Sequence, residues 1–275
     1  MMLCARDFRF PLGKRTYVMG VLNYTADSFS DGGLYNTPEA AAAYAQAMQA
    51  AGADIIDLGA QSTRPDAELL TCTQELERLE PALAALRGNV SVPLSVDTFY
   101  PACAKAALES GVAIINDISG EFNGEMAALA KDYGAAYIVT HNPCGAGMEA
   151  TYPDGVVNAV RQFFLDALNL AAECGLPRTQ LCLDIGLGFG KSYEDQLTLL
   201  RELEWLKFSG VALVAAASRK RFIGAASGEK NPQKRDPGTV AAHTAAIAGG
   251  ADIIRAHNVA AAVQGARMAD AIYRS

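Results

Sequence analysis

The amino-acid sequence predicts an α/β fold: one (β/α)8 barrel over residues 1–275, preceded by a short hairpin. Apolar runs, each typical of a strand buried on both faces, recur along the chain. Segments rich in Ala, Leu, Glu and Gln with helical period lie between them, and no linker interrupts the series. The length of 275 residues suits this fold, because such barrels often have about 250 residues. An open, doubly wound sheet is the alternative that the same alternation allows.

Eight strands are expected, and each begins with apolar residues. They cover residues 16–23, 55–62, 93–99, 114–120, 136–142, 181–188, 212–219 and 253–259. Helices are expected between them, for example over residues 37–52, 73–86 and 193–206. Residues 1–15 resemble a short hairpin around the PLGK sequence at 11–14, placed to plug the lower end of the barrel.

Local signals support several helix boundaries. Thr37 precedes Pro38, so we expect Thr37 to cap the first helix with the proline in its first turn. Gly52, Gly111 and Gly134 each follow a helical segment and precede an apolar run. Glycine is the residue that most easily ends a helix, so these three positions are expected helix ends.

Composition excludes several classes of protein. The net charge of −7 argues against non-specific binding to nucleic acid, which needs a basic surface. No uncharged apolar stretch of about 18 residues is present, so no membrane span is expected. The six cysteines show no CxxC spacing, and the first residues are too short and too charged for a signal peptide. We therefore expect free thiols and a cytoplasmic protein.

Polar residues follow almost every expected strand. They are Asn23; Gln61, Ser62, Thr63 and Arg64; Asp97; Asn116 and Asp117; His141 and Asn142; Asp184; Ser218, Arg219 and Lys220; and Arg255, His257 and Asn258. A closed barrel brings the carboxyl ends of all its strands to one mouth, where such residues form a single site. For any one of them the alternative is a structural role. An Asp or Asn after a strand often caps a helix, and His141 alone could be structural.

The residue types at this mouth indicate the chemistry of the ligand. Carboxylates such as Asp97 and Asp184 accept hydrogen bonds from a heterocycle rich in N–H groups. Cations such as Arg64, Lys220 and Arg255 suit a phosphate or carboxylate. We therefore expect a ligand with a donor-rich planar end and an anionic end. No nucleotide-binding glycine fingerprint and no zinc motif accompanies these residues; GLGFGKS at 186–192 has neither spacing.

Seven motifs together resemble the dihydropteroate synthase family over nearly the whole chain. They are GVLNYTADSFSDGG (20–33), STRP (62–65), SVDT (95–98), IINDISG (114–120), LDIGLGFGK (183–191), SRKRFIG (218–224) and IIRAHNV (253–259). The resemblance implies a pterin-binding TIM barrel and a transferase of folate biosynthesis. Such an enzyme condenses 6-hydroxymethyl-7,8-dihydropterin pyrophosphate with p-aminobenzoate and releases 7,8-dihydropteroate and pyrophosphate. It also implies a cytoplasmic homodimer formed through the last helices, and a sulfonamide target.

The resemblance assigns roles to the residues that match the family motifs. The catalytic set would be Asn23, Asp97, Lys220, Arg255 and His257. The pterin would contact Asp97, Asn116, Asp184, Phe189, Lys220 and Arg255. The p-aminobenzoate would contact Phe29, Thr63, Arg64, Pro65, Phe189, Ser218 and Lys220. Pyrophosphate would bind Asn23, Thr63, Arg64, Arg255 and His257, and Asn23 would share a Mg²⁺ ion with it.

The first motif is then expected to act as a lid. Asn23 would hold the metal and phosphate end, Gly32 and Gly33 would permit movement, and Phe29 would pack on the second substrate. Closure would exclude water and orient the two reactants. The implied reaction is dissociative: pyrophosphate leaves before the aromatic amine attacks, and no covalent enzyme nucleophile is needed.

Several positions depart from the family pattern, among them Ala60, Ile185, Ala256 and Asn258. Gln61 replaces a carboxylate, Asp66 follows STRP in place of glycine, and Ala26 replaces a proline. Asn142 stands where a methionine often packs on the pterin. The effect of these changes on rate and sulfonamide response stays open.

Two other functions stay open as well. A methyltetrahydrofolate:corrinoid methyltransferase would share the pterin site but gives no reason for the anion-binding residues. A non-catalytic or altered-specificity pterin-binding paralogue would fit the changed supporting residues.

Overall fold

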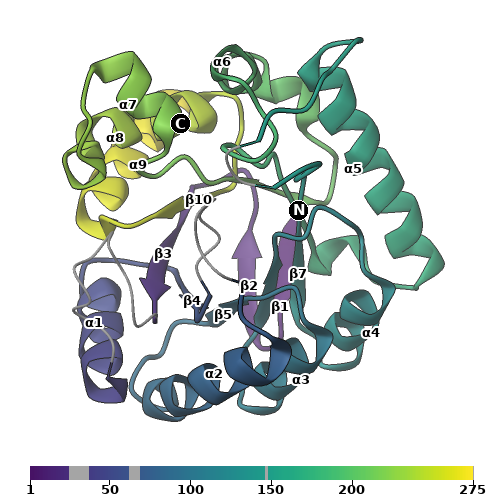
Figure 1. Cartoon of the computed structure of the whole chain (residues 1–275), viewed down its shortest axis with the longest axis vertical. Coiled ribbons are helices and arrows are strands. Elements are labelled where there is room, and N and C mark those ends of the chain that lie inside the picture. The colour runs from purple at the N-terminus through teal and green to yellow at the C-terminus, as the bar shows by residue number, and fades with distance from the viewer. Residues whose placement is uncertain (25–36, 62–68, 146–147, 275) are drawn as a thin grey trace.

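Parallel strands close into a barrel in the order β10-β3-β4-β5-β6-β7-β8-β9 (Figure 1). The computed structural model describes residues 1–24, 37–61, 69–145 and 148–274. The barrel strands are β3 (Tyr17–Asn23), β4 (Ile55–Gly59), β5 (Leu94–Asp97), β6 (Ile114–Asp117), β7 (Ala136–Thr140), β8 (Leu181–Asp184), β9 (Ala212–Ala215) and β10 (Ile253–Ala256). Because β10 pairs with both β3 and β9, the sheet is closed. The predicted barrel is confirmed, and the open-sheet alternative is excluded.

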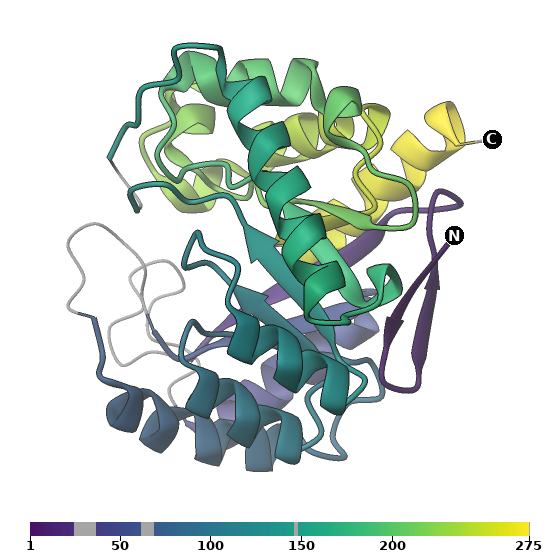
Figure 2. The same cartoon turned by 90° about the vertical axis from the view of Figure 1, so that its right-hand side faces the viewer.

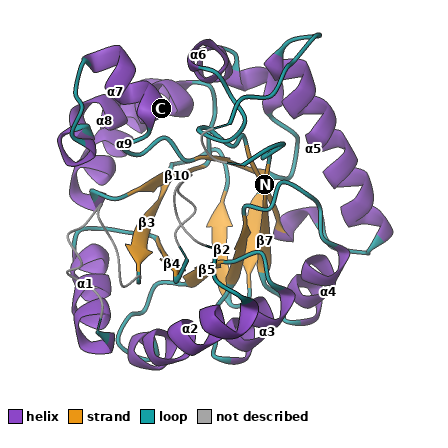
Figure 3. Cartoon of the chain, in the orientation of Figure 1, coloured by secondary structure: helices purple, strands orange, loops and turns teal. Residues whose placement is uncertain are grey.

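Helices surround the strands on all sides (Figure 3). They are α1 (Pro38–Ala50), α2 (Cys72–Leu86), α3 (Pro101–Glu109), α4 (Gly124–Asp132), α5 (Val156–Glu173), α6 (Tyr193–Arg201), α7 (Arg221–Ser227), α8 (Asp236–Ala248) and α9 (Val259–Tyr273). The expected cap is confirmed, since the Thr37 hydroxyl accepts a hydrogen bond from the Ala40 N–H at 3.2 Å. Gly52 follows α1 with φ of 98°, a conformation that favours glycine. None of the described helices is both long and apolar enough to span a membrane.

The expected strands run past the ends of the observed ones. The clearest case is the run 181–188, because β8 ends at Asp184. Ile185 and Leu187 continue the apolar pattern and are fully buried, although they belong to the loop. Gly186 breaks the extended conformation between them with φ of 65°. The apolar run therefore predicts burial correctly but places the end of the strand too late. Residues 185–188 belong to the loop at the mouth of the barrel.

The N-terminal hairpin closes the end of the barrel at which the strands begin (Figure 2). β1 (Met2–Ala5) pairs antiparallel with β2 (Phe8–Pro11). The turn lies at Arg6 and Asp7, so the prediction of a hairpin around PLGK is wrong in the place of its turn. Phe10 packs edge-on against Tyr17 at 4.9 Å between ring centroids. The expected plug is thus present, and water is excluded from this end of the interior.

The barrel interior changes from apolar to polar along its axis. Successive residues of a strand alternate between its faces, so positions two residues apart point the same way. Ile55, Ile114, Cys182 and Ile253 pack in the apolar cluster that contains the hairpin. Two residues further along the same strands stand Asp57, Asn116, Asp184 and Arg255. The strand period therefore places a charged layer directly above an apolar one, facing the mouth.

Candidate functional site

Arg255 lies at the centre of the charged layer. Its Nε donates to Oδ2 of Asp57 at 2.6 Å, and its Nη2 donates to Oδ2 of Asp97 at 2.9 Å. The same Oδ2 of Asp57 accepts from Nδ2 of Asn116 at 3.1 Å. These contacts connect β10, β4, β5 and β6 across the barrel. One guanidinium thus orders two carboxylates and an amide that come from distant parts of the chain.

The two carboxylates on Arg255 differ in their exposure. Asp57 is fully buried, whereas the Asp97 side chain is 17% exposed. Burial raises the pKa of Asp97 to about 7; Arg255 opposes the rise and the charge of Asp57 adds to it. Burial lowers the pKa of Arg255, but Asp57 and Asp97 outweigh this effect and hold it above its ordinary value. Arg255 therefore stays cationic, and Asp97 is the carboxylate that titrates within reach of a ligand.

Asn23 and Asp97 flank a gap on the inner surface of the sheet. Asn23 pairs in register with Gly59, and Gly59 pairs with Asp97. A methyl group added at Gly59 would lie 3.8 Å from Oδ2 of Asp97 and 3.9 Å from Oδ1 of Asn23. Glycine here leaves space between the amide and the carboxylate. The prediction that Asn23 and Asp97 share one mouth agrees with this geometry.

Asp184 stands at the end of β8 beside two further predicted residues. Its Oδ1 accepts from the Gly186 N–H at 2.7 Å. Lys220 donates to the Leu187 carbonyl, and its ammonium lies 4.7 Å from the centroid of the Phe189 ring. Burial raises the pKa of Asp184, which Lys220 moderates, and burial lowers the pKa of Lys220 to about 8. The two groups form an opposed pair of buried charges.

Asp184 is not a helix cap. Helix α6, which follows β8, begins at Tyr193 and is capped by Ser192. Asp97 likewise ends β5, and the next helix, α3, has no side-chain cap. Helix capping, the structural role considered for an Asp after a strand, is therefore excluded for these two carboxylates. Asn258, by contrast, does cap α9 through a hydrogen bond from the Ala261 N–H at 3.1 Å.

His141 serves a structural purpose together with Lys191. Nζ of Lys191 lies 2.9 Å from Nδ1 of His141 and donates to the carbonyls of His141 and Phe189 at 3.0 and 2.9 Å. Burial and then Lys191 lower the pKa of His141 to about 3, so the ring is neutral and accepts the hydrogen bond. Lys191 thus ties the loop after β8, which carries Phe189, to the loop after β7.

Ser218 and His257 form a pair between the ends of β9 and β10. The Ser218 oxygen accepts from the His257 backbone N–H at 3.1 Å and lies 2.9 Å from Nδ1 of that ring. Burial and the charge of Arg255 lower the pKa of His257 to about 3. The ring is therefore neutral, and we assign the hydroxyl hydrogen to the bond with Nδ1. In this arrangement Nε2 carries the imidazole hydrogen.

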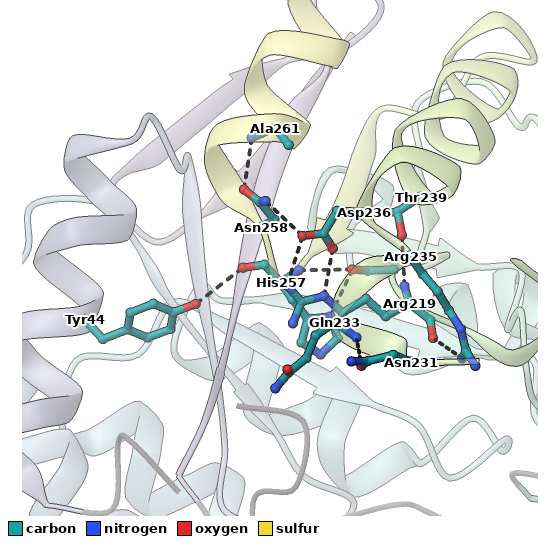
Figure 4. A network of polar contacts seen from close by, with 11 residues as sticks. Tyr44, Arg219, Asn231, Gln233, Arg235, Asp236, Thr239, His257, Asn258 and Ala261 are labelled. Carbon is teal, nitrogen blue, oxygen red and sulfur yellow. Dashed lines mark hydrogen bonds and ion pairs between the residues drawn. The ribbon is translucent and has the colours of Figure 1, made fainter. Parts of the chain in front are cut away.

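The Arg219 side chain lies near His257 and takes part in a polar network (Figure 4). Its Nε and Nη2 donate to the two oxygens of Asp236 at 2.8 and 3.1 Å, and Asn258 donates to Oδ2 at 2.9 Å. Arg219 has φ of 58°, which is rare for a residue with a side chain. This left-handed residue separates Ser218, which faces His257, from Lys220, which faces Asp184 and Phe189.

Two of the departures from the family pattern support the loops. Oε1 of Gln61 accepts from the Leu70 N–H at 2.6 Å. Asn142 donates from Nδ2 to the Ile118 carbonyl and accepts at Oδ1 from the Gly145 N–H, each at 2.7 Å. Asn142 therefore holds two loops of the mouth together through both ends of its amide.

Part of the predicted site lies outside the described residues. These positions are Ala26, Phe29, Gly32, Gly33, Thr63, Arg64, Pro65 and Asp66, together with most of the expected lid.

The structure also reveals residues that the sequence reading missed. Asp57, Lys191 and Asp236 each make hydrogen bonds that fix a predicted site residue or its loop. Asp57 had a detectable signal, because it is a charged residue inside an otherwise apolar strand. Asp236 had none, since its partners Arg219 and Asn258 are distant in sequence.

Comparisons with known proteins agree with this geometry. Residues 19–257 match the family model described as pterin binding enzyme. The dihydropteroate synthase of Synechocystis sp. is 45% identical over 96% of this chain and 93% of its own length. The dihydropteroate synthase structure from Clostridium difficile with pteroic acid has a TM-score of 0.89 and 39% identity, covering 97% of this chain and 100% of that one. The structure from Yersinia pestis with a sulfonamide has a TM-score of 0.91 and 34% identity, covering 99% and 98%.

The barrel, the carboxylates and cations at its mouth and these full-length similarities lead to one conclusion. The chain belongs to the dihydropteroate synthase family, the pterin-binding transferases that condense 6-hydroxymethyl-7,8-dihydropterin pyrophosphate with p-aminobenzoate in folate biosynthesis.

Proposed function

We propose that the mouth of the barrel divides the dihydropteroate synthase reaction between a pterin end and an anion end, with Arg255 between them. The observation that carries this proposal is the position of Arg255, which pairs with Asp97 on one side and lowers the pKa of His257 on the other. Both carboxylates assigned to the site, Asp97 and Asp184, belong to the pterin end, whereas the residues assigned to the anion end are neutral or cationic. This polarity matches a substrate with a donor-rich ring and a pyrophosphate.

The pterin end consists of Asp97, Asn116, Asp184 and Lys220. Asn116 and Asp184 are 4% and 5% exposed, so a ligand that reaches them is largely removed from water. A carboxylate in such a site accepts two adjacent N–H donors of a planar ring, and charge-assisted bonds of this kind are strong. The cationic Lys220 then offers a donor to a ring acceptor, and Phe189 beside it offers an aromatic face.

The anion end consists of Arg255, His257 and Asn23. Arg255 supplies charge to the departing pyrophosphate, and the neutral His257 supplies a hydrogen bond from Nε2. Stabilising the charge that develops on a leaving group is the main catalytic contribution in such a reaction. The mechanism we propose is dissociative, so the amine of p-aminobenzoate attacks a pterin methylene carbon already separating from pyrophosphate. No side chain needs to act as a nucleophile.

At the anion end, Mg²⁺ would be held by the Asn23 amide oxygen together with the substrate phosphates. The part of the chain described here has no group of three or more His, Cys, Asp or Glu that could hold a metal ion. Mg²⁺ needs few protein ligands when it is bound together with substrate phosphates, and it prefers oxygen. The half-buried Asn23 amide beside the Gly59 gap offers one such oxygen. When bound, the ion would neutralise negative charge on the pyrophosphate oxygens.

For p-aminobenzoate we propose a place above the pterin, against Phe189 and Lys220. Ser218 would support this wall indirectly, because its hydroxyl is already engaged with His257. The proposed contacts with Phe29, Thr63, Arg64 and Pro65 rest on the sequence motifs. We further propose that sulfonamides occupy the same place, supported by the Yersinia pestis relative that was solved with one.

Assembly and location are proposals of the same kind. We propose a homodimer through α9, because Met268, Ile272 and Tyr273 on this helix are 63%, 53% and 52% exposed. Sedimentation velocity tests this, and a monomer at micromolar concentration contradicts it.

All six cysteines are free, which suits a protein of the reducing cytoplasm. The location is tested by cell fractionation, and recovery outside the cytoplasmic fraction contradicts it.

The variant Asp184→Asn tests the pterin end. The amide has the same shape but accepts hydrogen bonds at only one of its two ends and turns an NH₂ toward the second ring donor. Losing one buried, charge-assisted hydrogen bond costs roughly 2–4 kcal/mol, so pterin affinity should fall about 30- to 1,000-fold. Titration of both proteins with a pterin measures the change.

Asp132→Asn is the matched control for this experiment. Asp132 ends α4 on the surface and is exposed, so its variant should keep wild-type affinity. Unchanged pterin affinity in Asp184→Asn, with the fold intact, removes Asp184 from the site.

Pterin binding should weaken in acid because of Asp97. The folded protein has a pKa of about 7 at this carboxyl group, so it loses its ability to accept two hydrogen bonds as the pH falls through 7. The affinity of a phosphate-free pterin should drop roughly tenfold or more between pH 7.5 and 5.5, as expected when binding requires one deprotonated group. In Asp97→Asn the affinity should be lower and nearly flat over this range. A wild-type affinity that does not change with pH contradicts the assignment.

Substrate binding should be ordered. We expect p-aminobenzoate to bind poorly to the free enzyme and well once pyrophosphate and Mg²⁺ are present, because Asn23 and Arg255 both face the anion end. Calorimetry with p-aminobenzoate, and in parallel with a sulfonamide, measures this under both conditions. Omitting Mg²⁺ alone serves as the control and should abolish most of the gain. Equal affinity with and without the two additions argues against the ordered scheme.

A further inference from the structure

Asp57 is a carboxylate in the layer of the barrel that also contains Asn116, Asp184 and Arg255. It lies in the middle of β4, faces inward above the apolar layer and is fully buried. One of its oxygens, Oδ2, accepts from both Arg255 and Asn116. The other, Oδ1, is buried and has no hydrogen-bond partner within the described ranges. The carboxylate thus uses one oxygen to hold two side chains of the mouth.

Removing a carboxylate from water is costly, and its stabilising effect on a fold is small at best. An apolar residue at position 57 would extend the layer formed by Ile55 and its neighbours on the other strands. The orientation of its neighbouring side chains therefore explains Asp57 better than a contribution to the stability of the fold does. It contacts two residues that the proposed function places in the site.

The geometry points to Asp57 as a positioning residue, which fixes the guanidinium of Arg255 and the amide of Asn116 in the orientation that the substrates need. This inference rests on the proposed function. Asp57 holds Arg255 through Nε, which leaves the outer nitrogens of the guanidinium directed to Asp97 and the mouth. It holds Asn116 through Nδ2, which leaves the amide oxygen as the group available to a ring donor.

Asp57 also determines how strongly Arg255 competes with a pterin for the Asp97 carboxylate. Both carboxylates pair with one cation, but Asp57 is fully buried and Asp97 is partly exposed. A pterin that uses Asp97 must share it with Arg255 or displace the guanidinium. With Asp57 in place, Arg255 keeps one ion pair while Asp97 turns to the ligand. Without its charge, Arg255 would pair with Asp97 alone and weaken the acceptor.

The test compares Asp57→Asn with Asp252→Asn. Asp252 is a buried carboxylate directly before β10, at the end of the barrel opposite the mouth, and it accepts from the Gly13 N–H at 3.2 Å and the Leu213 N–H at 3.1 Å. Both variants remove one buried charge, and both should lower the melting temperature. A phosphate-free pterin and inorganic pyrophosphate with Mg²⁺ are titrated separately into each protein.

We expect Asp57→Asn to lose about 10- to 100-fold in affinity for both probes, while Asp252→Asn stays within about twofold of wild type. Where Asp57→Asn does not fold, Asp57→Ser replaces it, because its hydroxyl is smaller and still accepts one hydrogen bond. Wild-type affinity for both probes in a folded Asp57 variant overturns the inference.

Arg255→Met, titrated in parallel, separates this inference from the proposed function. Loss of pyrophosphate affinity in Arg255→Met but not in Asp57→Asn overturns only the role of Asp57. Full pyrophosphate affinity in Arg255→Met overturns the proposed anion end, and with it the reason for positioning Arg255.

Discussion

The guanidinium of Arg255 between Asp57 and Asp97 is the interaction on which the site depends. It joins four strands through hydrogen bonds of 2.6, 2.9 and 3.1 Å, counting the one from Asn116 to Asp57. A cation shared by two carboxylates in a barrel interior holds both in fixed positions while leaving a net negative charge for a donor-rich ring. Burial and the charge of this cation lower the pKa of His257 and keep its ring neutral, and the proposed function places the pyrophosphate on that side of Arg255.

The fold creates this interaction through two simple constraints. The hairpin seals the end where the strands begin, so Phe10 and Tyr17 keep water from the apolar layer below the charges. Residues two positions apart on a strand face the same side. Asp57 therefore follows Ile55, and Arg255 follows Ile253, on the inner face of the barrel. Closure of the sheet pairs β10 with β3, so that Ile253 lies beside Tyr17, 236 residues earlier in the sequence. Loops tied by Lys191 and Asn142 complete the mouth above this layer.

Much of this could be predicted from the sequence, for physical reasons that also explain the failures. Alternating apolar and helical segments favour a barrel over an open sheet, and polar residues after each strand indicate its mouth, so Asp97, Asp184 and Arg255 were predicted. Asp57 was not predicted, because it stands inside an apolar run and only the closed barrel shows that its side chain faces the interior. The pairing of Ser218 with His257 depends on the closure of β9 against β10. The predicted strand continued past Asp184, where β8 ends, because Ile185 and Leu187 are also apolar and buried.

A double-mutant cycle tests whether Asp57 acts through Arg255 in the reaction. The quantity measured is kcat/KM for pyrophosphate release in the presence of p-aminobenzoate and Mg²⁺. The proteins are the wild type, Asp57→Asn, Arg255→Met and the double variant. If the two residues act as a unit, the double variant should lose clearly less than the product of the two single losses. Losses that multiply would show that Asp57 and Arg255 act independently, and would contradict the account.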